Sequence, residues 1–466
     1  MKLILPLLAL VLTVASVAQA QPLGGEQPLL RNIAGQVSVD ALKATDTRLV
    51  GFGTRHTLSD TVSEVRGIGA ARRWVAAQFA ALAAQCGGCL KIETPSQMFT
   101  GPRVPTPTAI VDVLAIQRGT TDPDRVIVIS AHIDSLMSDF LDGKSDAPGA
   151  NDDGSGVSAV MEAARVLSAH KFPATIVYAV LSGEEQGLYG GKVLADYAVA
   201  QGWRVEATLN NDIVGNTHGQ SGVVDNTHVR VFSEGSRTNE TPAQIKARHD
   251  SGGELDSPSR NVARLMQTLA DRYLADLQVK MVYRPDRFAR GGDHIEMLNQ
   301  GFPAVRVTEA VEDYTREHQR VRIENGIHYG DVLEWVDFPY LAKVTRLNAL
   351  SLATLASAPE PPRAVAISGA VTPDTTVKWT AVPGAAAYRV WWRDTTEAQW
   401  RYSRVVAQGA ETKLAGINID DWFFRVSSIG PDGFESPVAT PGASGGFERL
   451  APAAPTPSFI TAPPVK

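Results

Sequence analysis

An alternation of apolar runs and a helical repeat constrains the fold of this chain most. Residues 126–130 (Val-Ile-Val-Ile-Ser) and 176–181 (Ile-Val-Tyr-Ala-Val-Leu) each predict a buried strand. Between them, residues 156–170 repeat apolar side chains at helical spacing. Strand, helix and strand at this length predict a βαβ unit, which implies a mostly parallel sheet.

Further elements are predicted on both sides of this unit. They are helices at 69–90, 262–277 and 338–355 and strands at 205–209 and 301–307. We therefore expect an α/β domain over residues 21–357, with a mostly parallel mixed sheet flanked by helices. A chain of 466 residues is also long enough for a second domain.

The composition changes at residues 358–362 (Ala-Pro-Glu-Pro-Pro), which predict a Pro-rich linker. Strand patterns then follow one another with turn residues between them, which indicates a small all-β sandwich over residues 363–441. Through Trp379, Tyr388-Arg-Val and the Asp432-Gly433 turn, this stretch resembles a fibronectin type III module. Residues 442–466 form an Ala/Pro-rich tail.

The first 20 residues predict an export signal. Lys2 precedes an apolar run from Leu3 to Val17, and Ala18-Gln19-Ala20 offers a small-x-small cleavage site. We expect an exported protein, periplasmic or extracellular, that begins at Gln21 and has no transmembrane segment. The net charge of -6 gives no basic surface for nucleic acid.

Cys86 and Cys89, in Cys-Gly-Gly-Cys, are the two cysteines of the sequence. A zinc site would need a second ligand pair at suitable spacing, and none is evident. A thioredoxin-like redox pair lacks its surrounding pattern of strand, motif and helix. Because the chain is expected to be exported, we predict a short structural disulfide between Cys86 and Cys89.

Residues able to bind metal follow the first predicted strand. His132 and Asp134 are two apart, so in an extended segment their side chains face the same way. His132 can bind a metal while Asp134 fixes its ring tautomer. In the Gly-rich segment 147–156, a carboxylate of Asp152 or Asp153 can bridge two cations, or can cap the following helix.

Two more strands end in acidic residues. Glu184 and Glu185 follow the second strand, where adjacent carboxylates repel each other unless a positive charge offsets them. One can bind a metal while the other serves as a general base, or the pair can form a solvated turn. Asp212 follows the third strand. Imidazole and carboxylate ligands without thiolate suit zinc, cobalt or manganese, and open α/β sheets place active sites at strand ends.

These ordered segments resemble the co-catalytic zinc aminopeptidase family, which also includes glutamate carboxypeptidases and glutaminyl cyclases. The resemblance is to an exported, bacterial-type zinc exopeptidase, covers about residues 49–355, and includes residues 51–56 (Gly-Phe-Gly-Thr-Arg-His) and 291–296 (Gly-Gly-Asp-His-Ile-Glu). It implies two zinc ions. The implied roles are His132 and Asp212 on one zinc, Glu185 on the other, Asp152 as the bridge, Asp134 as orienting partner and Glu184 as general base.

The resemblance also implies a last histidine ligand after a Gly-x-Pro-Ala strand, which here is residues 301–304. His318 follows this strand in the expected order and is the predicted ligand. His294 resembles the family's upstream Asp-His segment, which supports the site, and His328 lies in a polar turn.

The resemblance implies an exported aminopeptidase that acts on peptides with a free N-terminus. The substrate amine would bind a metal or an acidic group such as Asp153. A carboxypeptidase would instead need basic groups for the substrate carboxylate, and Arg287, Arg290 and Arg306 are candidates. A single-zinc cyclase and a non-enzymatic receptor or adhesion protein are further alternatives. The C-terminal module is expected to be an accessory that contacts a surface or polymer.

Overall fold

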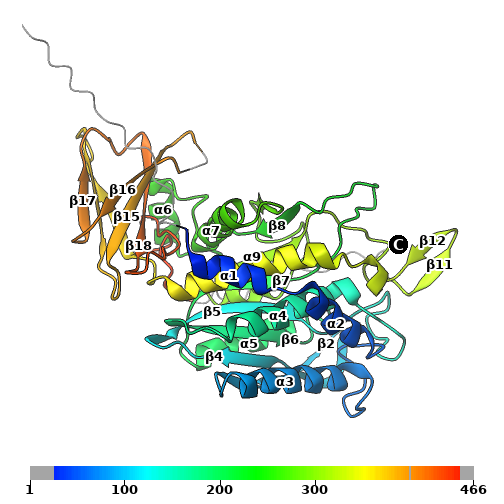
Figure 1. Cartoon of the computed structure of the whole chain (residues 1–466). Helices are drawn as coiled ribbons and strands as arrows, with labels where there is room; N and C mark the ends of the chain where they lie inside the picture. Colours follow the sequence, from blue (N-terminus) through cyan, green and yellow to red (C-terminus); the bar gives the residue numbers. More distant parts are fainter. Residues whose placement is uncertain (1–25, 398–399, 452–466) are drawn as a thin grey trace, which may run out of the picture.

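The computed structural model describes residues 26–397 and 400–451. These residues form a large α/β domain and a small β domain (Figure 1). The predicted export signal and residues 452–466 lie outside the described residues. The α/β domain is built on an eight-stranded sheet in the order β1-β4-β6-β5-β7-β10-β8-β9. Its strands are β1 (Leu90–Glu93), β4 (Val113–Gln117), β5 (Asp122–His132), β6 (Ala174–Leu181), β7 (Arg204–Asn211), β8 (His228–Phe232), β9 (Gln278–Val282) and β10 (Ala304–Glu309).

The centre of this sheet is parallel. β5 pairs in parallel with both β6 and β7, and β7 pairs in parallel with β10. Towards the edges, β4 runs antiparallel to β6, and β8 runs antiparallel to β10. The predicted α/β class with a mostly parallel mixed sheet is therefore confirmed.

Helices cover both faces because the central strands are apolar on both sides. In β5, Ile127 and Ile129 pack into the larger core, and the alternating Val126 and Val128 pack into the smaller one. The larger core includes residues of α1 (Pro28–Gln36), α2 (Val39–Val50), α3 (Gly67–Gln85), α4 (Gly156–Leu167), α7 (Pro258–Tyr273) and α9 (Phe338–Ser357). The smaller core includes residues of α5 (Tyr189–Ala200) and α8 (His294–Asn299).

Smaller elements surround the sheet. Two hairpins, β2–β3 and β11–β12, lie outside the main sheet, and β11–β12 protrudes at the right of Figure 1. Among the described residues, no helix combines the length and the apolar character that a membrane crossing requires. The bounds are β2 (Ser96–Gly101), β3 (Val104–Val111), β11 (Arg322–Glu324), β12 (Ile327–Tyr329), α6 (Pro242–Ser251) and the short turns η1 (Ala150–Ser155) and η2 (Leu333–Trp335).

The small domain consists of two three-stranded antiparallel sheets, β13-β14-β17 and β16-β15-β18. Its core contains Trp379 and Tyr388, whose ring centroids are 5.2 Å apart, together with Phe424. Its likeness to fibronectin type III stays a prediction. The strands are β13 (Arg363–Ser368), β14 (Thr375–Thr380), β15 (Ala387–Asp394), β16 (Tyr402–Val406), β17 (Glu411–Leu414) and β18 (Trp422–Ile429).

Buried polar contacts join the two domains. Arg393 of β15 lies 3.0 Å from Asp256 of the large domain, and both side chains are almost fully buried. The predicted linker 358–362 lies between α9 and β13, and the carbonyl oxygen of Ala358 accepts a hydrogen bond from Arg125 (2.7 Å). At the start of the predicted tail, the carbonyl oxygen of Gly446 accepts one from Arg237 (3.0 Å).

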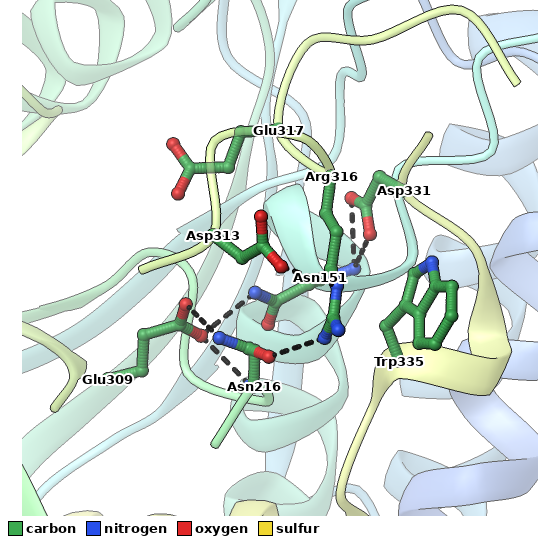
Figure 2. A pocket seen from close by; sticks show the side chains of 8 residues that line it. All are labelled: Asn151, Asn216, Glu309, Asp313, Arg316, Glu317, Asp331 and Trp335. Carbon is green, nitrogen blue, oxygen red and sulfur yellow. Dashed lines mark hydrogen bonds and ion pairs between the residues drawn. The ribbon is translucent and has the colours of Figure 1, made fainter. Parts of the chain in front are cut away.

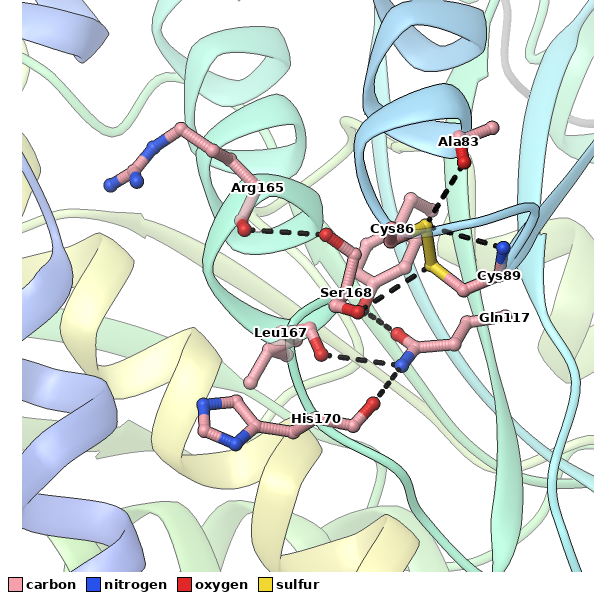
Figure 3. The surroundings of a disulfide bond; sticks show 9 residues. Ala83, Cys86, Cys89, Gln117, Arg165, Leu167, Ser168 and His170 are labelled. Carbon is pink, nitrogen blue, oxygen red and sulfur yellow. Dashed lines mark hydrogen bonds between the residues drawn. A yellow bond between two sulfur atoms is a disulfide. The ribbon is translucent and has the colours of Figure 1, made fainter.

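Cys86 and Cys89 lie where α3 ends, and their sulfur atoms are 2.04 Å apart (Figure 3). Gly87 and Gly88 both have positive φ, so the chain reverses between the cysteines. Neither of the groups of side chains able to hold a metal among the described residues contains a cysteine. The oxidised pair in the exported protein stays a prediction.

Candidate metal centre

Three central strands bring their following residues to one edge of the sheet. His132 is the last residue of β5, Glu184 and Glu185 follow β6, and Asp212 follows β7. Because these strands are parallel neighbours, their carboxyl ends meet at the same edge. Side chains separated by up to 80 residues in sequence therefore lie close together.

One group of possible ligands contains His132, Asp152 and Asp212. Nε2 of His132 lies 3.2 Å from Oδ1 of Asp152 and 3.9 Å from Oδ1 of Asp212. One ligand atom from each residue lies within 4.8 Å of the other two, and all three residues are buried. This arrangement can hold one cation.

A second group contains Asp152, Glu185 and His318. Nε2 of His318 lies 3.0 Å from Oδ2 of Asp152 and 2.9 Å from Oε1 of Glu185. Oε1 of Glu185 is buried and makes no hydrogen bond of acceptable geometry, as expected for a ligand atom that points at a shared third atom. Asp152 belongs to both groups and presents one oxygen to each, so its carboxylate is placed to bridge two cations.

The donor set fits zinc. Two imidazole nitrogens and three carboxylates are ligands that zinc accepts, and no thiolate is present. The predicted ligands His132, Asp152, Glu185, Asp212 and His318 all lie in these two groups, which are the groups of this kind found in the described part of the chain. The assignment of each ligand stays a prediction.

The buried charges at this site favour cation binding. Burial alone would raise the pKa of Asp152, but hydrogen bonds to His132 and His318 hold it well below its usual range. Burial would lower the pKa of His318, but Glu185 and Asp152 raise it well above its usual range. The metal-free site therefore attracts protons to its histidines, and a bound cation would displace them.

Glu184 differs from its neighbour because it belongs to neither ligand group. Burial raises its pKa well above the usual range for a glutamate, and a nearby dication would oppose that rise. A carboxylate that is half-buried near the ligands but not among them can accept a proton, which is the role predicted for Glu184.

Asp134 contacts both His132 and the glutamate turn. Nδ1 of His132 lies 3.0 Å from the main-chain oxygen of Asp134 and 3.7 Å from its carboxylate Oδ1. That carboxylate also accepts hydrogen bonds from the main-chain N–H groups of Glu184 (3.3 Å) and Glu185 (3.2 Å) and from Thr57 (3.0 Å). Asp134 therefore holds the glutamate turn against the His132 strand, a role that sequence reasoning missed.

Asp331 also supports the site and was not found from the sequence. Its carboxylate accepts hydrogen bonds from the main-chain N–H groups of Asn151 (2.8 and 3.0 Å) and Asp152 (2.7 Å). Figure 2 shows the Asp331 carboxylate next to the main-chain nitrogen of Asn151, at the wall of a small pocket. Asn151 in turn donates to Glu309 (2.8 Å). These contacts fix the loop that presents Asp152.

Two buried arginines complete the support. Arg55 donates to the carbonyl oxygens of Ile133 (2.7 Å) and Gly149 (2.8 Å), so it ties together the two loops that carry His132 and Asp152. It lies in the segment 51–56 on which the resemblance partly rests, but its role was not predicted. Nη1 of Arg306, on β10, lies 2.6 Å from Oδ2 of Asp212.

The other candidates lie outside the two groups. Nε2 of His294 lies 2.8 Å from the carbonyl oxygen of Pro285, and His328 lies on the exposed β12 strand. Asp153 is fully buried and accepts hydrogen bonds from the main-chain N–H groups of His132 (3.1 Å), Gly156 (3.0 Å) and Ile213 (3.3 Å). The suggestion that Asp153 contacts the substrate amine is therefore corrected, because its carboxylate is occupied by the main chain.

Comparison with known proteins gives the family. Residues 112–332 match the model of peptidase family M28. The chain is 40% identical over 418 residues to a protein of Pyrenophora teres f. teres (strain 0-1) named "Probable zinc metalloprotease", with 88% of this chain and 86% of that protein covered. A protein of the same name from Pyricularia oryzae (strain 70-15 / ATCC MYA-4617 / FGSC 8958) is 39% identical, with 88% and 84% covered. The chain belongs to peptidase family M28.

Solved structures agree with the fold of the large domain. LapB from Legionella pneumophila is 19% identical, with a TM-score of 0.51, and the match covers 71% of this chain and 76% of that one. The LapA aminopeptidase of Legionella pneumophila is also 19% identical, with a TM-score of 0.50 and coverage of 77% and 80%. At this identity the likeness shows the fold alone.

Proposed function

We propose that this chain is an exported zinc aminopeptidase that removes N-terminal residues from peptides. Its membership of family M28 and its relatives named as zinc metalloproteases make it a zinc-dependent peptidase. The observation that carries the two-metal proposal is that Asp152 belongs to both ligand groups, while Glu184 belongs to neither. Cobalt or manganese can substitute for zinc in such a donor set.

In the proposed reaction, the two ligand groups would hold two zinc ions, which would supply Lewis acidity. Glu184 takes the proton from the attacking water and delivers it to the departing amine. Asp134 keeps Glu184 in place by accepting its main-chain N–H (3.3 Å). Asp331 and Arg55 hold the loop of the bridging carboxylate, so the ligands are fixed before substrate arrives.

The free N-terminus of the substrate needs an acceptor, and we assign this role to Glu317. Glu317 directly precedes His318 and is buried, and its Oε1 has no hydrogen-bond partner. Its other oxygen, Oε2, lies 3.3 Å from Arg290. A buried acceptor without a partner favours a donor such as an ammonium group.

A carboxypeptidase is the second candidate, and Arg290 is the observation that favours it. The Arg290 side chain is 34% exposed and lies beside Glu312 and Glu317, so part of it can reach a substrate carboxylate. Arg306 is fully buried against Asp212, and Arg287 lies 3.5 Å from Glu312. Arg306 and Arg287 are therefore less suited than Arg290 to bind a substrate carboxylate.

A panel of substrates separates these activities. Aminoacyl p-nitroanilides, N-blocked peptides and peptides with acidic C-termini would be incubated with the purified protein, with chelator and with chelator followed by zinc. We expect cleavage of the aminoacyl substrates alone, loss of activity with chelator and recovery with zinc. Cleavage of N-blocked peptides at the C-terminal bond would support the carboxypeptidase instead.

The C-terminal β domain is proposed as an accessory that contacts a surface or polymer. Its position supports this role, because it packs against one end of the large domain, and the β11–β12 hairpin lies at the other end (Figure 1). A pull-down with insoluble polysaccharides and peptidoglycan tests this accessory role. It compares the whole protein with the protein lacking residues 363–451.

A further inference from the structure

A second pocket lies between the two domains, at the opposite edge of the sheet from the metal ligands. It has a cavity volume of about 160 Å³ and lies where β5 and β7 begin. Since a strand rises about 3.3 Å per residue, the seven steps from Arg125 to His132 separate the pocket from the metal ligands by about 23 Å. Its lining combines arginine and glutamate side chains with the rings of Trp203 and Phe447.

Glu206 is the feature that indicates a ligand. Its side chain is buried, and Oε2 accepts a hydrogen bond from Nη1 of Arg125 (3.0 Å). Its other oxygen, Oε1, is buried without a hydrogen-bond partner. In the pairing of β5 with β7, Val126 lies opposite Val205 and the next residue, Ile127, lies opposite Ala207. Glu206 has no partner on β5 and is therefore the extra residue of a β-bulge. A buried carboxylate oxygen with no donor is costly, which favours a ligand that brings one.

Arginines in the same pocket have capacity to bind a carboxylate. The side chains of Arg204 and Arg363 are 46% and 43% exposed. Arg204 uses Nη2 to pair with Asp122 (2.6 Å), and Arg363 uses Nη2 to pair with Glu360 (2.9 Å). Arg449 donates to the main-chain oxygen (2.8 Å) and side-chain oxygen (2.9 Å) of Gln300, which are both neutral. Each guanidinium carries five N–H donors, and these contacts use only part of them.

The mixture of charges in the lining favours a ligand that carries both a positive and a negative group. An anion alone would be repelled by Glu206, Glu360 and Glu448, and a cation alone would be repelled by four arginines. A zwitterion satisfies both sets, and the rings of Trp203 and Phe447 offer apolar surface to a side chain.

We propose that this inter-domain pocket binds a free α-amino acid with an apolar side chain. Its ammonium group donates to Oε1 of Glu206, its carboxylate pairs with the exposed arginines, and its side chain packs beside Trp203 and Phe447. The choice of an amino acid among zwitterions rests on the proposed function, because free amino acids are the products of an aminopeptidase.

Calorimetry on the whole protein tests this proposal. The probe is L-phenylalanine, and the controls are 2-phenylethylamine, which lacks the carboxylate, and 3-phenylpropionate, which lacks the ammonium. Titration of chelator-treated protein removes metal-dependent binding at the active site. We expect L-phenylalanine to bind this protein and each control to bind at least about ten-fold more weakly, since one charge-assisted pair is lost.

Variants then locate the binding. Glu206→Gln should weaken L-phenylalanine binding about ten-fold while aminoacyl hydrolysis stays within about two-fold. Glu411→Gln, at an exposed glutamate of the small domain, is the matched control and should change neither. If Glu206→Gln fails to fold by circular dichroism, the Arg204→Ala/Arg363→Ala double variant takes its place, with the same expectation.

Some results overturn the inference. These are the absence of L-phenylalanine binding to chelated protein, equal binding of either control, and unchanged binding in both Glu206→Gln and the double arginine variant. If the protein is an active aminopeptidase and any of these results is found, the second site is refuted and the proposed function is not. Phenylalanine binding at this pocket in a protein that hydrolyses no aminoacyl substrate would instead refute the proposed function.

Discussion

Replacing Asp331 by alanine should weaken metal binding without touching a ligand. The Asp331 carboxylate accepts hydrogen bonds from two main-chain N–H groups, those of Asn151 and the bridging residue Asp152. A hydrogen bond to a charged group contributes about 1.5–3 kcal/mol, so the two donors together lose about 3–6 kcal/mol. Water entering the small pocket beside them recovers about half, which leaves about 2 kcal/mol.

This energy predicts a loss of affinity of about 30-fold, since about 1.4 kcal/mol corresponds to a factor of ten. It lies within the range of about 10–100-fold that loss of a group supporting a metal ligand produces. The assay is zinc binding in competition with a chromophoric chelator, together with kcat/KM at saturating zinc. The kcat/KM should recover most of its value when zinc is in excess.

Asp313→Ala is the control. Asp313 lines the same pocket, but its carboxylate contacts Thr315 and Arg316 and not the loop of Asp152. We expect its zinc affinity to stay within about three-fold of that of the unmodified protein, about 0.6 kcal/mol. Equal zinc affinity in Asp331→Ala and Asp313→Ala would refute the reasoning, because it would show that the contacts of Asp331 do not hold Asp152.

Three further predictions follow from the same structure. Glu184→Gln should lower kcat by about 100-fold or more while metal analysis still finds about two zinc ions per chain; a nearly active variant would remove Glu184 from the role of base. Burial raises the pKa of Glu234 from 4.5 to about 7, so its protonated form stabilises the fold below about pH 4.5, and this stability is lost as pH rises through 7. The free energy of unfolding of Glu234→Gln, measured by urea unfolding, should therefore rise by about 3 kcal/mol relative to that of the unmodified protein between pH 4.5 and 8. A difference that stays constant over this pH range would contradict the prediction. Arg393→Ala removes one partner of the buried pair between the domains and should cost about 3 kcal/mol and expose residues 358–362 to proteolysis, whereas the exposed Arg404→Ala should do neither.

The secondary structure could be predicted from the sequence wherever burial on both faces produces long apolar patterns. Residues 126–130 and 176–181 lie within β5 and β6, and the helix predicted from 156 begins at Gly156 as α4. The ends were less accurate. The helix predicted to reach 90 ends at Gln85 because Gly87 and Gly88 take positive φ values.

The candidate site was predictable to the extent that its residues directly follow strands. His132, Glu185 and Asp212 are placed by β5, β6 and β7, so strand order alone brings them together. Asp331 and Arg306 had no such signal. Their roles depend on contacts with main-chain groups and with Asp212 across more than 90 residues of sequence, and a single sequence does not show these contacts.

The most direct test of the two-metal site is a crystal structure of the zinc-loaded protein with anomalous data collected at the zinc edge. We expect two zinc peaks, with one oxygen of Asp152 bound to each, His132 and Asp212 on one ion, and Glu185 and His318 on the other. A single peak, or two peaks that Asp152 does not connect, would refute the two-metal site.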